Sequence, residues 1–198
     1  MSSNDLFVPF VSYALLMIFT PGPNNLLASV LGLQQGYRRT LPCLGGMALG
    51  FLVIMLCGGL LTDFFTRNYN AIAPYLKWTG VAYMVWLALS LFLPSKKKNG
   101  SKSTVGFVGG FALQFLNPKG ILFGITIYTS FSSILVGDLA RTVGSALVLA
   151  MVGFTALSTW ALAGSALSRW FANPRFKLAF NLVMVALLAY SIWSIIVH

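Results

Sequence analysis

Apolar residues run along this chain in six long stretches that are separated by short polar segments. The stretches are Leu6–Leu33, Leu41–Leu61, Ile72–Leu93, Val105–Phe131, Thr142–Leu167 and Leu178–Val197. About 20 apolar residues in a helix cross the ~30 Å hydrocarbon core of a bilayer. Only helices and closed barrels satisfy the backbone in lipid, and barrel strands alternate apolar with polar residues, which these stretches do not. The pattern predicts an all-α integral membrane protein with six transmembrane helices.

The composition agrees with a chain that is solvated by lipid. Of 198 residues, 58% are hydrophobic and 8% are charged, and the mean hydropathy is +0.84. About a quarter of the residues in a soluble domain are charged. The net charge of +10 does not indicate a nucleic-acid partner, because the cations sit in short clusters between apolar stretches and not along one face. The expected partner is the lipid bilayer.

The basic residues also predict the orientation of the chain. If the N-terminus is external, nine basic residues fall on the inner side: Arg38, Arg39, Lys96, Lys97, Lys98, Lys102, Arg169, Arg175 and Lys177. Only Arg67, Lys77 and Arg141 then fall near the outer side. Because loops on the inner side of a membrane carry the excess of Lys and Arg, both termini are predicted on the outer, periplasmic side.

The segment at about 95–104 is basic and polar, and it divides the chain nearly in half. The sequence predicts one transporter domain over 1–198, with a first repeat at about 1–94 and a second at about 105–198. Each half holds three stretches, so the two halves must cross the membrane in opposite directions. Two inverted three-helix repeats are a recurrent transporter design.

The first stretch is interrupted by the polar and helix-breaking run Thr20-Pro21-Gly22-Pro23-Asn24-Asn25. Proline removes a helix donor and clashes with the preceding turn, whereas it suits the first position of a new helix. We therefore expect an unwound segment followed by a half-helix that begins near Pro23. Its N-terminus would present free amides and a partial positive charge to the interior, although a simple kink packed against its neighbours would also fit.

The fourth stretch is interrupted at Gln114 and at Asn117-Pro118-Lys119. An ammonium near the middle of a bilayer costs ~2.5–3.5 kcal/mol on insertion scales, so Lys119 should face a polar cavity. The three carboxylates, Asp5, Asp63 and Asp138, all lie near span ends. Lys119 is therefore suited to an anion that a substrate supplies, such as a carboxylate. The alternative is a lysine held by asparagine and carbonyl groups.

The candidate substrate-binding residues lie at these two interruptions, with one further candidate in the last stretch. They are Thr20, Pro21, Gly22, Pro23, Asn24, Asn25, Gln114, Asn117, Pro118 and Lys119, and Asn181 is a possible pathway residue. The only histidine is terminal, and the carboxylates are scattered. The sequence thus offers no catalytic triad, no metal site and no nucleotide-binding loop, so neither an enzyme nor a cofactor is expected. Glycine pairs at four-residue spacing, Gly46 with Gly50 and Gly106 with Gly110, allow close helix packing and permit a homodimer.

Several motifs resemble those of the LysE/RhtB family of amino-acid exporters. They are the run Thr20–Asn25, Gly36-Tyr37-Arg38, the run Gly45–Gly50 and Asn117-Pro118-Lys119. The segments Phe111–Phe115 and Trp160–Gly164, with Gly50-Phe51, resemble most the cysteine/O-acetylserine exporters of the family. The resemblance implies efflux of small amino acids across a bacterial inner membrane without an organic cofactor. Many relatives carry an acidic residue where this chain has Phe51, which leaves the usual proton carrier missing.

We therefore expect a secondary transporter that exports small amino acids or their derivatives by alternating access. The half-helix at Pro23 and the Lys119 side chain would hold the substrate carboxylate, and the neighbouring amides would contact its amino group or polar side chain. A channel-like facilitator of small zwitterions and a non-transporting membrane scaffold are the two alternatives.

Overall fold

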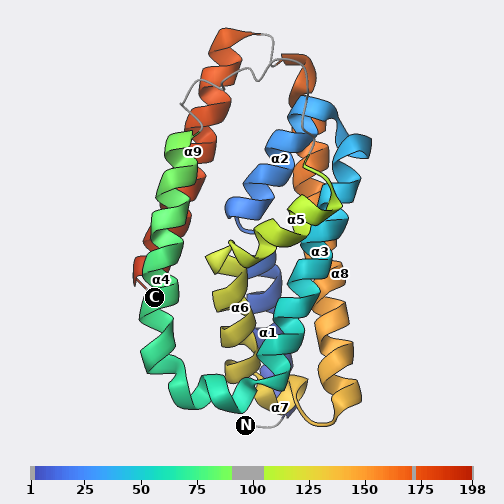
Figure 1. The fold of residues 1–198 in the computed structure, drawn as a ribbon, viewed down its shortest axis with the longest axis vertical. Helices are drawn as coiled ribbons and strands as arrows, with labels where there is room; N and C mark the ends of the chain where they lie inside the picture. Colours follow the sequence, from blue (N-terminus) through green and yellow to red (C-terminus); the bar gives the residue numbers. More distant parts are fainter. Residues whose placement is uncertain (1–2, 91–104, 171–172, 198) are drawn as a thin grey trace.

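The computed structural model describes residues 3–90, 105–170 and 173–197, and these residues are helical with short connections and no strand. The helices are α1 (Ser3–Phe19), α2 (Pro23–Gln35), α3 (Tyr37–Leu60), α4 (Thr62–Ser90), α5 (Phe107–Phe115), α6 (Pro118–Ser130), α7 (Ser132–Leu135), α8 (Leu139–Leu167), the 3₁₀ turn η1 (Ser168–Trp170) and α9 (Pro174–Val197). The predicted all-α class is confirmed for this part of the chain (Figure 1). The predicted linker at 95–104 lies outside the described residues.

Several of these helices are long and apolar enough to cross a membrane. In the described residues they are α3, the continuous helical segment Leu139–Trp170 and α9, with α1 and α2 as a fourth span if the bent pair is counted as one. The spans expected at Ile72–Leu93 and Val105–Phe131 correspond to α4 and to α5 with α6. Helix α4 and the pair α5 and α6 are not among the described helices that are long and apolar enough to cross a membrane, so length and composition alone do not establish six crossings.

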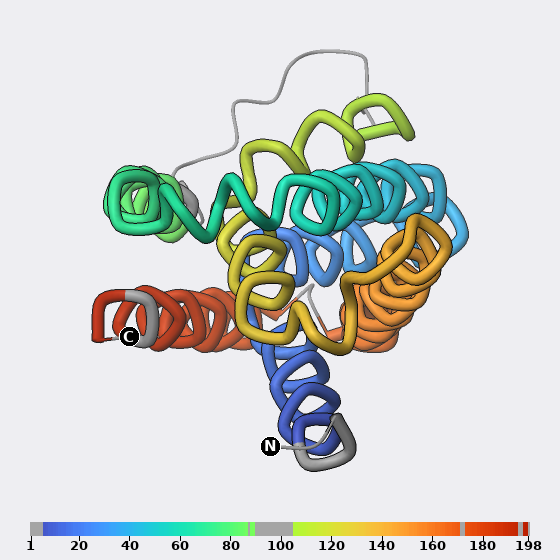
Figure 2. Tube along the Cα trace, turned by 90° about the horizontal axis from the view of Figure 1, so that it is seen from below, coloured from blue at the N-terminus to red at the C-terminus, as the bar shows by residue number. Residues whose placement is uncertain are grey.

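The two half-helices that follow the breaks, α2 and α6, lie in the middle of the bundle (Figures 1 and 2). Helix α2 packs against α8, and α3 packs against both α5 and α8. Helix α4 contacts α6 and α9, while the N-terminal part of α1 extends away from the other helices (Figure 2). Gly36 has φ 81°, a conformation that suits glycine, and it lets the chain turn from α2 into α3.

Glycines bring two of these helix pairs to backbone contact. A Cβ on Gly32 would lie 2.0 Å from the carbonyl oxygen of Ala161, and one on Gly164 would lie 1.9 Å from that of Ser29, so α2 and α8 touch directly. In the same way, Gly46 of α3 lies against the backbone of α5, and Gly110 of α5 lies against the backbone of α3. Of the four glycines predicted to pack helices, Gly46, Gly50 and Gly110 meet another helix of the chain, whereas a Cβ on Gly106 would have nothing within 4 Å; the homodimer stays a prediction.

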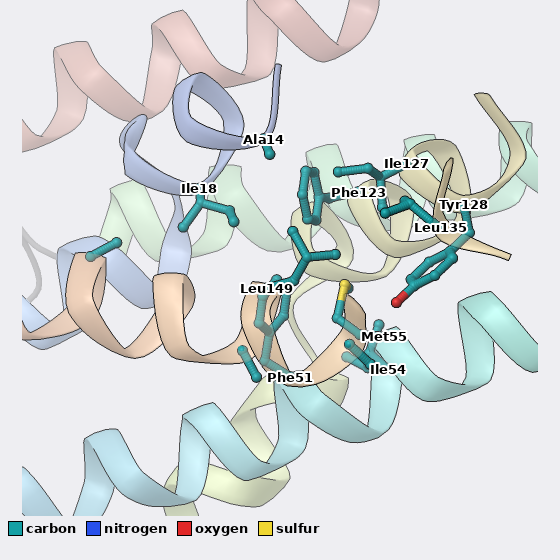
Figure 3. Close-up of a cluster of buried hydrophobic side chains, with 13 residues drawn as sticks. Ala14, Ile18, Phe51, Ile54, Met55, Phe123, Ile127, Tyr128, Leu135 and Leu149 are labelled. Carbon is teal, nitrogen blue, oxygen red and sulfur yellow. The ribbon is translucent and has the colours of Figure 1, made fainter. Parts of the chain in front are cut away.

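The largest apolar cluster lies between α1, α3, α6 and α8 (Figure 3). Phe51 of α3 and Phe123 of α6 stack with ring centroids 6.0 Å apart, and Tyr13 of α1 stacks on Phe123 at the same distance. The chain of rings continues to Phe131, whose ring centroid lies 6.0 Å from that of Tyr13. This cluster fills the bundle between the break region and the end where α7 lies.

Candidate substrate site between two broken helices

The first break lies where the sequence predicts it. Helix α1 ends at Phe19 and α2 begins at Pro23, with an angle of 47° between them. Gly22 is the extended residue before α2 and offers no side chain to cap it. The first-turn backbone N–H groups of Asn24 and Asn25 have no partner within the helix, because an α-helix bonds its N–H groups only from the fourth residue on.

Side chains from four helices hold the backbone carbonyl groups of this first break. Asn25 Nδ2 donates to Ile18 O and Thr20 O, at 2.9 Å each. Ser191 Oγ of α9 donates to Pro21 O, and Trp160 Nε1 of α8 donates to Phe19 O at 3.2 Å. Lys119 of α6 supplies the remaining donor, described below. An unwound segment inside a membrane protein is stable only when its polar groups are bonded in this way.

The second break is tighter and its backbone bonds are local. Helix α5 ends at Phe115 and α6 begins at Pro118, again as the sequence predicts. Leu116 N donates to Leu113 O and Asn117 N donates to Gln114 O, both at 3.2 Å. The Asn117 side chain makes no capping bond to α6. Both half-helices therefore start with a proline and without a side-chain cap.

Lys119 reaches from the second break to the first. Its Nζ donates to Thr20 Oγ1 at 2.7 Å, to Thr20 O at 3.0 Å and to Pro21 O at 3.2 Å. In this conformation Lys119 is therefore held by oxygen atoms of the protein, as the second of the two sequence interpretations expects. The acceptors lie just after the C-terminal end of α1, and none of them belongs to an asparagine. The side chain passes over Gly22, where a Cβ would lie 2.8 Å from Lys119 Cδ.

A cavity of about 60 Å³ opens between the two breaks. It is lined by Met17, Ile18, Gly22, Asn24, Asn25, Phe51, Gln114, Asn117, Lys119, Gly120, Phe123, Gly153 and Leu157. The polar lining comes from the starts of α2 and α6 and the end of α5, and the apolar lining comes from α1, α3, α6 and α8. The cavity has room for more than one water molecule.

Two buried amide oxygens in this lining have no hydrogen-bond partner. They are Oδ1 of Asn24, a residue 5% exposed, and Oδ1 of Asn117, a residue 7% exposed. Asn24 uses its Nδ2 to donate to Gln114 Oε1. Since buried polar atoms are nearly always bonded, these two acceptors indicate a place for a donor that a ligand or water supplies.

The predicted site residues are thus brought together, with one exception. Gly22, Asn24, Asn25, Gln114, Asn117 and Lys119 line the cavity, Thr20 and Pro21 bind Lys119, and Pro23 and Pro118 start the half-helices. Asn181 lies on α9 and is not among the lining residues.

Sequence reasoning missed Ser191 and Trp160, which hold the first break. A lone serine in the last apolar stretch is a weak signal, and an indole in a span gives no sign of which carbonyl it meets. The described residues contain no group of three His, Cys, Asp or Glu side chains placed to hold a metal ion.

These features define the class of the protein: a helical membrane protein with a cavity, lined by polar and apolar side chains, between two broken helices. The chain belongs to the LysE family, because its residues 15–192 match the family described as LysE type translocator. It is therefore a multi-pass membrane transport protein and not an enzyme.

Curated relatives match along nearly the whole chain. Cysteine/O-acetylserine efflux proteins of Escherichia coli (strain K12), Shigella flexneri serotype 5b (strain 8401) and Salmonella choleraesuis (strain SC-B67) are each 37% identical to it over 187 residues. The match covers 93% of this chain and 94% of each relative. No solved structure matches the chain.

Proposed function

We propose that this protein exports small amino acids or their derivatives, of the size of cysteine and O-acetylserine, across the bacterial inner membrane by alternating access. The observation that carries the proposal is the cavity, where two uncapped half-helices and Lys119 meet two unpartnered amide oxygens. Such a site combines N–H donors and positive charge with free acceptors, which matches a zwitterion. The names of the curated relatives support the same substrate class.

The substrate carboxylate binds at the first turns of α2 and α6 and to Lys119. Helix N-termini favour anions because their free N–H groups and the helix dipole both point outward there. The free oxygens of Asn24 and Asn117 accept from the substrate's amino group or from a side-chain donor such as a thiol. Gln114 orients the Asn24 side chain, because its Oε1 accepts from Asn24 Nδ2.

The helix contacts support an inverted repeat of α1–α4 and α5–α9. The half-helices α2 and α6 each have 13 residues and each begin with proline. In such a repeat, α2 corresponds to α6, α3 to α8 and α4 to α9. The contact between α2 and α8 then has its counterpart in the contact between α6 and α3, and both contacts are present. Helices α3 and α8, and likewise α4 and α9, pack against their own counterparts. Rocking of the two three-span halves would expose the cavity to each side in turn.

The same repeat gives six crossings of one domain over 1–198, with the basic segment at 95–104 between the halves. Arg38 and Arg39 follow the turn from α2 to α3, and Arg169 and Arg175 flank the turn from α8 to α9. Both turns lie at the same end of the bundle, opposite α7 (Figure 1). This end faces the cytoplasm under the positive-inside rule, so the termini face the periplasm.

The test uses purified protein in proteoliposomes loaded with labelled cysteine, O-acetylserine or serine, with leucine and lysine as larger comparisons. We expect saturable efflux of the small substrates, accelerated by unlabelled substrate outside. Cysteamine, which has the amine and thiol of cysteine but no carboxylate, should not accelerate it. Flux that neither saturates nor responds to outside substrate would indicate a facilitator. The absence of flux from folded protein would overturn the proposal in favour of a scaffold.

A further inference from the structure

The Lys119 amine has no hydrogen-bond donor left for a carboxylate in this conformation. A protonated lysine has three N–H donors, and Nζ has three oxygen acceptors between 2.7 and 3.2 Å: Thr20 Oγ1, Thr20 O and Pro21 O. We call these three oxygens the Thr20–Pro21 cradle. For Lys119 to bind a substrate carboxylate, its amine must first leave the cradle.

The cradle does not depend on Lys119 for its shape. Asn25 Nδ2 donates to Thr20 O at 2.9 Å, and Ser191 Oγ donates to Pro21 O. Thr20 Oγ1 donates to Met17 O at 3.0 Å, which turns its lone pairs toward Lys119. The cradle also lies just beyond the C-terminal end of α1, where the helix dipole is negative. It is thus a preformed site for an ammonium group.

The side chain of Lys119 has no carboxylate partner among the described side chains. It passes over Gly22, the residue at the positive N-terminal end of α2, where a Cβ would lie 3.3 Å from Nζ. Of the carboxylates whose side chains the structure describes, Asp63 is in the first turn of α4 and Asp138 caps α8, so neither lies at the breaks. A zwitterion would bring both an ammonium for the cradle and a carboxylate for the lysine.

We propose that the Thr20–Pro21 cradle is the ammonium subsite for the exported amino acid and that the Lys119 amine fills it only when substrate is absent. This inference rests on the proposed function. Arriving substrate places its own ammonium in the cradle, and the released Lys119 amine pairs with the substrate carboxylate. After release outside, Lys119 returns to the cradle, so the lone pairs that the substrate ammonium leaves are again met by a donor while the empty carrier resets.

The experiment compares two transport modes of the Lys119→Ala variant in proteoliposomes. Net efflux requires the empty carrier to reset, whereas exchange with the same substrate on both sides does not. We expect exchange to weaken, because the substrate carboxylate loses its Lys119 partner, and net efflux to fall at least tenfold further than exchange. Propylammonium has the same atoms that Lys119→Ala removes beyond Cβ, so millimolar propylammonium should restore net efflux, and uncharged propanol should not.

Lys77→Ala is the matched control, because Lys77 Nζ also donates to a backbone carbonyl, Ile196 O at 2.7 Å, on the exposed surface. It should keep both modes at the wild-type rates. A second variant, Gly22→Ala, keeps Lys119 but places a Cβ 2.8 Å from Lys119 Cδ, which pushes the Lys119 side chain out of the cradle. It should slow net efflux more than exchange, and it should add nothing in the Lys119→Ala background.

Equal loss of net efflux and exchange in Lys119→Ala, with no response to propylammonium, would overturn the inference and leave Lys119 as a direct carboxylate ligand only. Unchanged net efflux in Lys119→Ala or in Gly22→Ala would overturn it as well. If the wild type exchanges no amino acid under these conditions, the proposed function fails, and the inference falls with it. A loss confined to the variants leaves the proposed function intact.

Discussion

At both helix breaks a proline occupies the first position of the following half-helix, but the groups around the two prolines are bonded differently. Around the α1–α2 break, donors from α2, α6, α8 and α9 meet the carbonyl groups of Ile18, Phe19, Thr20 and Pro21. Around the α5–α6 break, the backbone bonds join residues three apart, and the Asn117 Oδ1 atom has no partner. The first break is therefore fixed by the whole bundle, and the second by its own turn.

This difference indicates a division of labour between the breaks. A break that four helices hold supplies a rigid set of acceptors, which suits a binding surface that must keep its shape. A break whose backbone bonds are local can change its contacts at lower cost, which suits the side that responds to substrate. The following substitutions test that division, from the largest expected effect on stability to the smallest.

Gly164→Ala should have the largest effect, because it separates α2, and with it the first break, from α8. The new Cβ would lie 1.9 Å from Ser29 O, which is a backbone atom and can move away only if the two helices separate. We expect a loss of about 3 kcal/mol, at the upper end for an overpacked core, measured as a lower thermal midpoint in detergent.

Gly144→Ala is the control for this substitution, because it lies in the same helix and its Cβ would have nothing within 4 Å. It should leave the midpoint unchanged or raise it slightly, since alanine favours helix over glycine. Equal midpoints for the two variants would contradict the backbone contact between α2 and α8.

Asn25→Ala should have the next largest effect, because it removes the donor that Ile18 O and Thr20 O share. Thr20 O keeps Lys119 Nζ as a donor, but Ile18 O loses its side-chain donor, and leaving a buried acceptor unbonded costs about 2 kcal/mol. Asn68→Ala removes a similar bond, from Nδ2 to Phe64 O at 2.8 Å, but on an exposed part of α4. Urea or thermal unfolding should separate the two variants clearly, and a similar loss in both would mean that the first break is not held by Asn25.

Asn117→Leu should have the smallest effect on stability, because the Oδ1 atom that it removes has no partner. We expect a change within about 1 kcal/mol, together with a roughly tenfold higher half-saturation concentration in amino-acid exchange. A tenfold change in affinity corresponds to about 1.4 kcal/mol. A stability loss as large as that of Asn25→Ala, with unchanged half-saturation, would reverse the roles of the two breaks.

The sequence was sufficient to locate both breaks, because the signal is local. Proline excludes itself from a helix interior and favours the first turn, so Pro23 and Pro118 mark the starts of α2 and α6 whatever surrounds them. The partners of the broken segments were not predictable, since Ser191 lies 170 residues from the Pro21 carbonyl that it binds. Only the packing of α9 brings them together.

Hydropathy was also a poor guide to where α4 begins. The apolar stretch starts at Ile72, but the helix starts at Thr62. Thr62 and Thr66 donate their hydroxyl groups to carbonyl groups one turn earlier, at 2.8 Å each, so these polar side chains bond to helical backbone. The hydropathy of a segment reports the solvent that it prefers and not the length of its helix.

The bond from Trp160 Nε1 to Phe19 O gives the protein a natural optical reporter at the first break. Of its five tryptophans, Trp78, Trp86, Trp170 and Trp193 are exposed, whereas Trp160 is partly buried. Indole emission shifts to shorter wavelength when its hydrogen bond and polar surroundings are lost. In a variant that keeps only Trp160, each change at the end of α1 would therefore be seen as a shift of the tryptophan emission wavelength, without any attached dye.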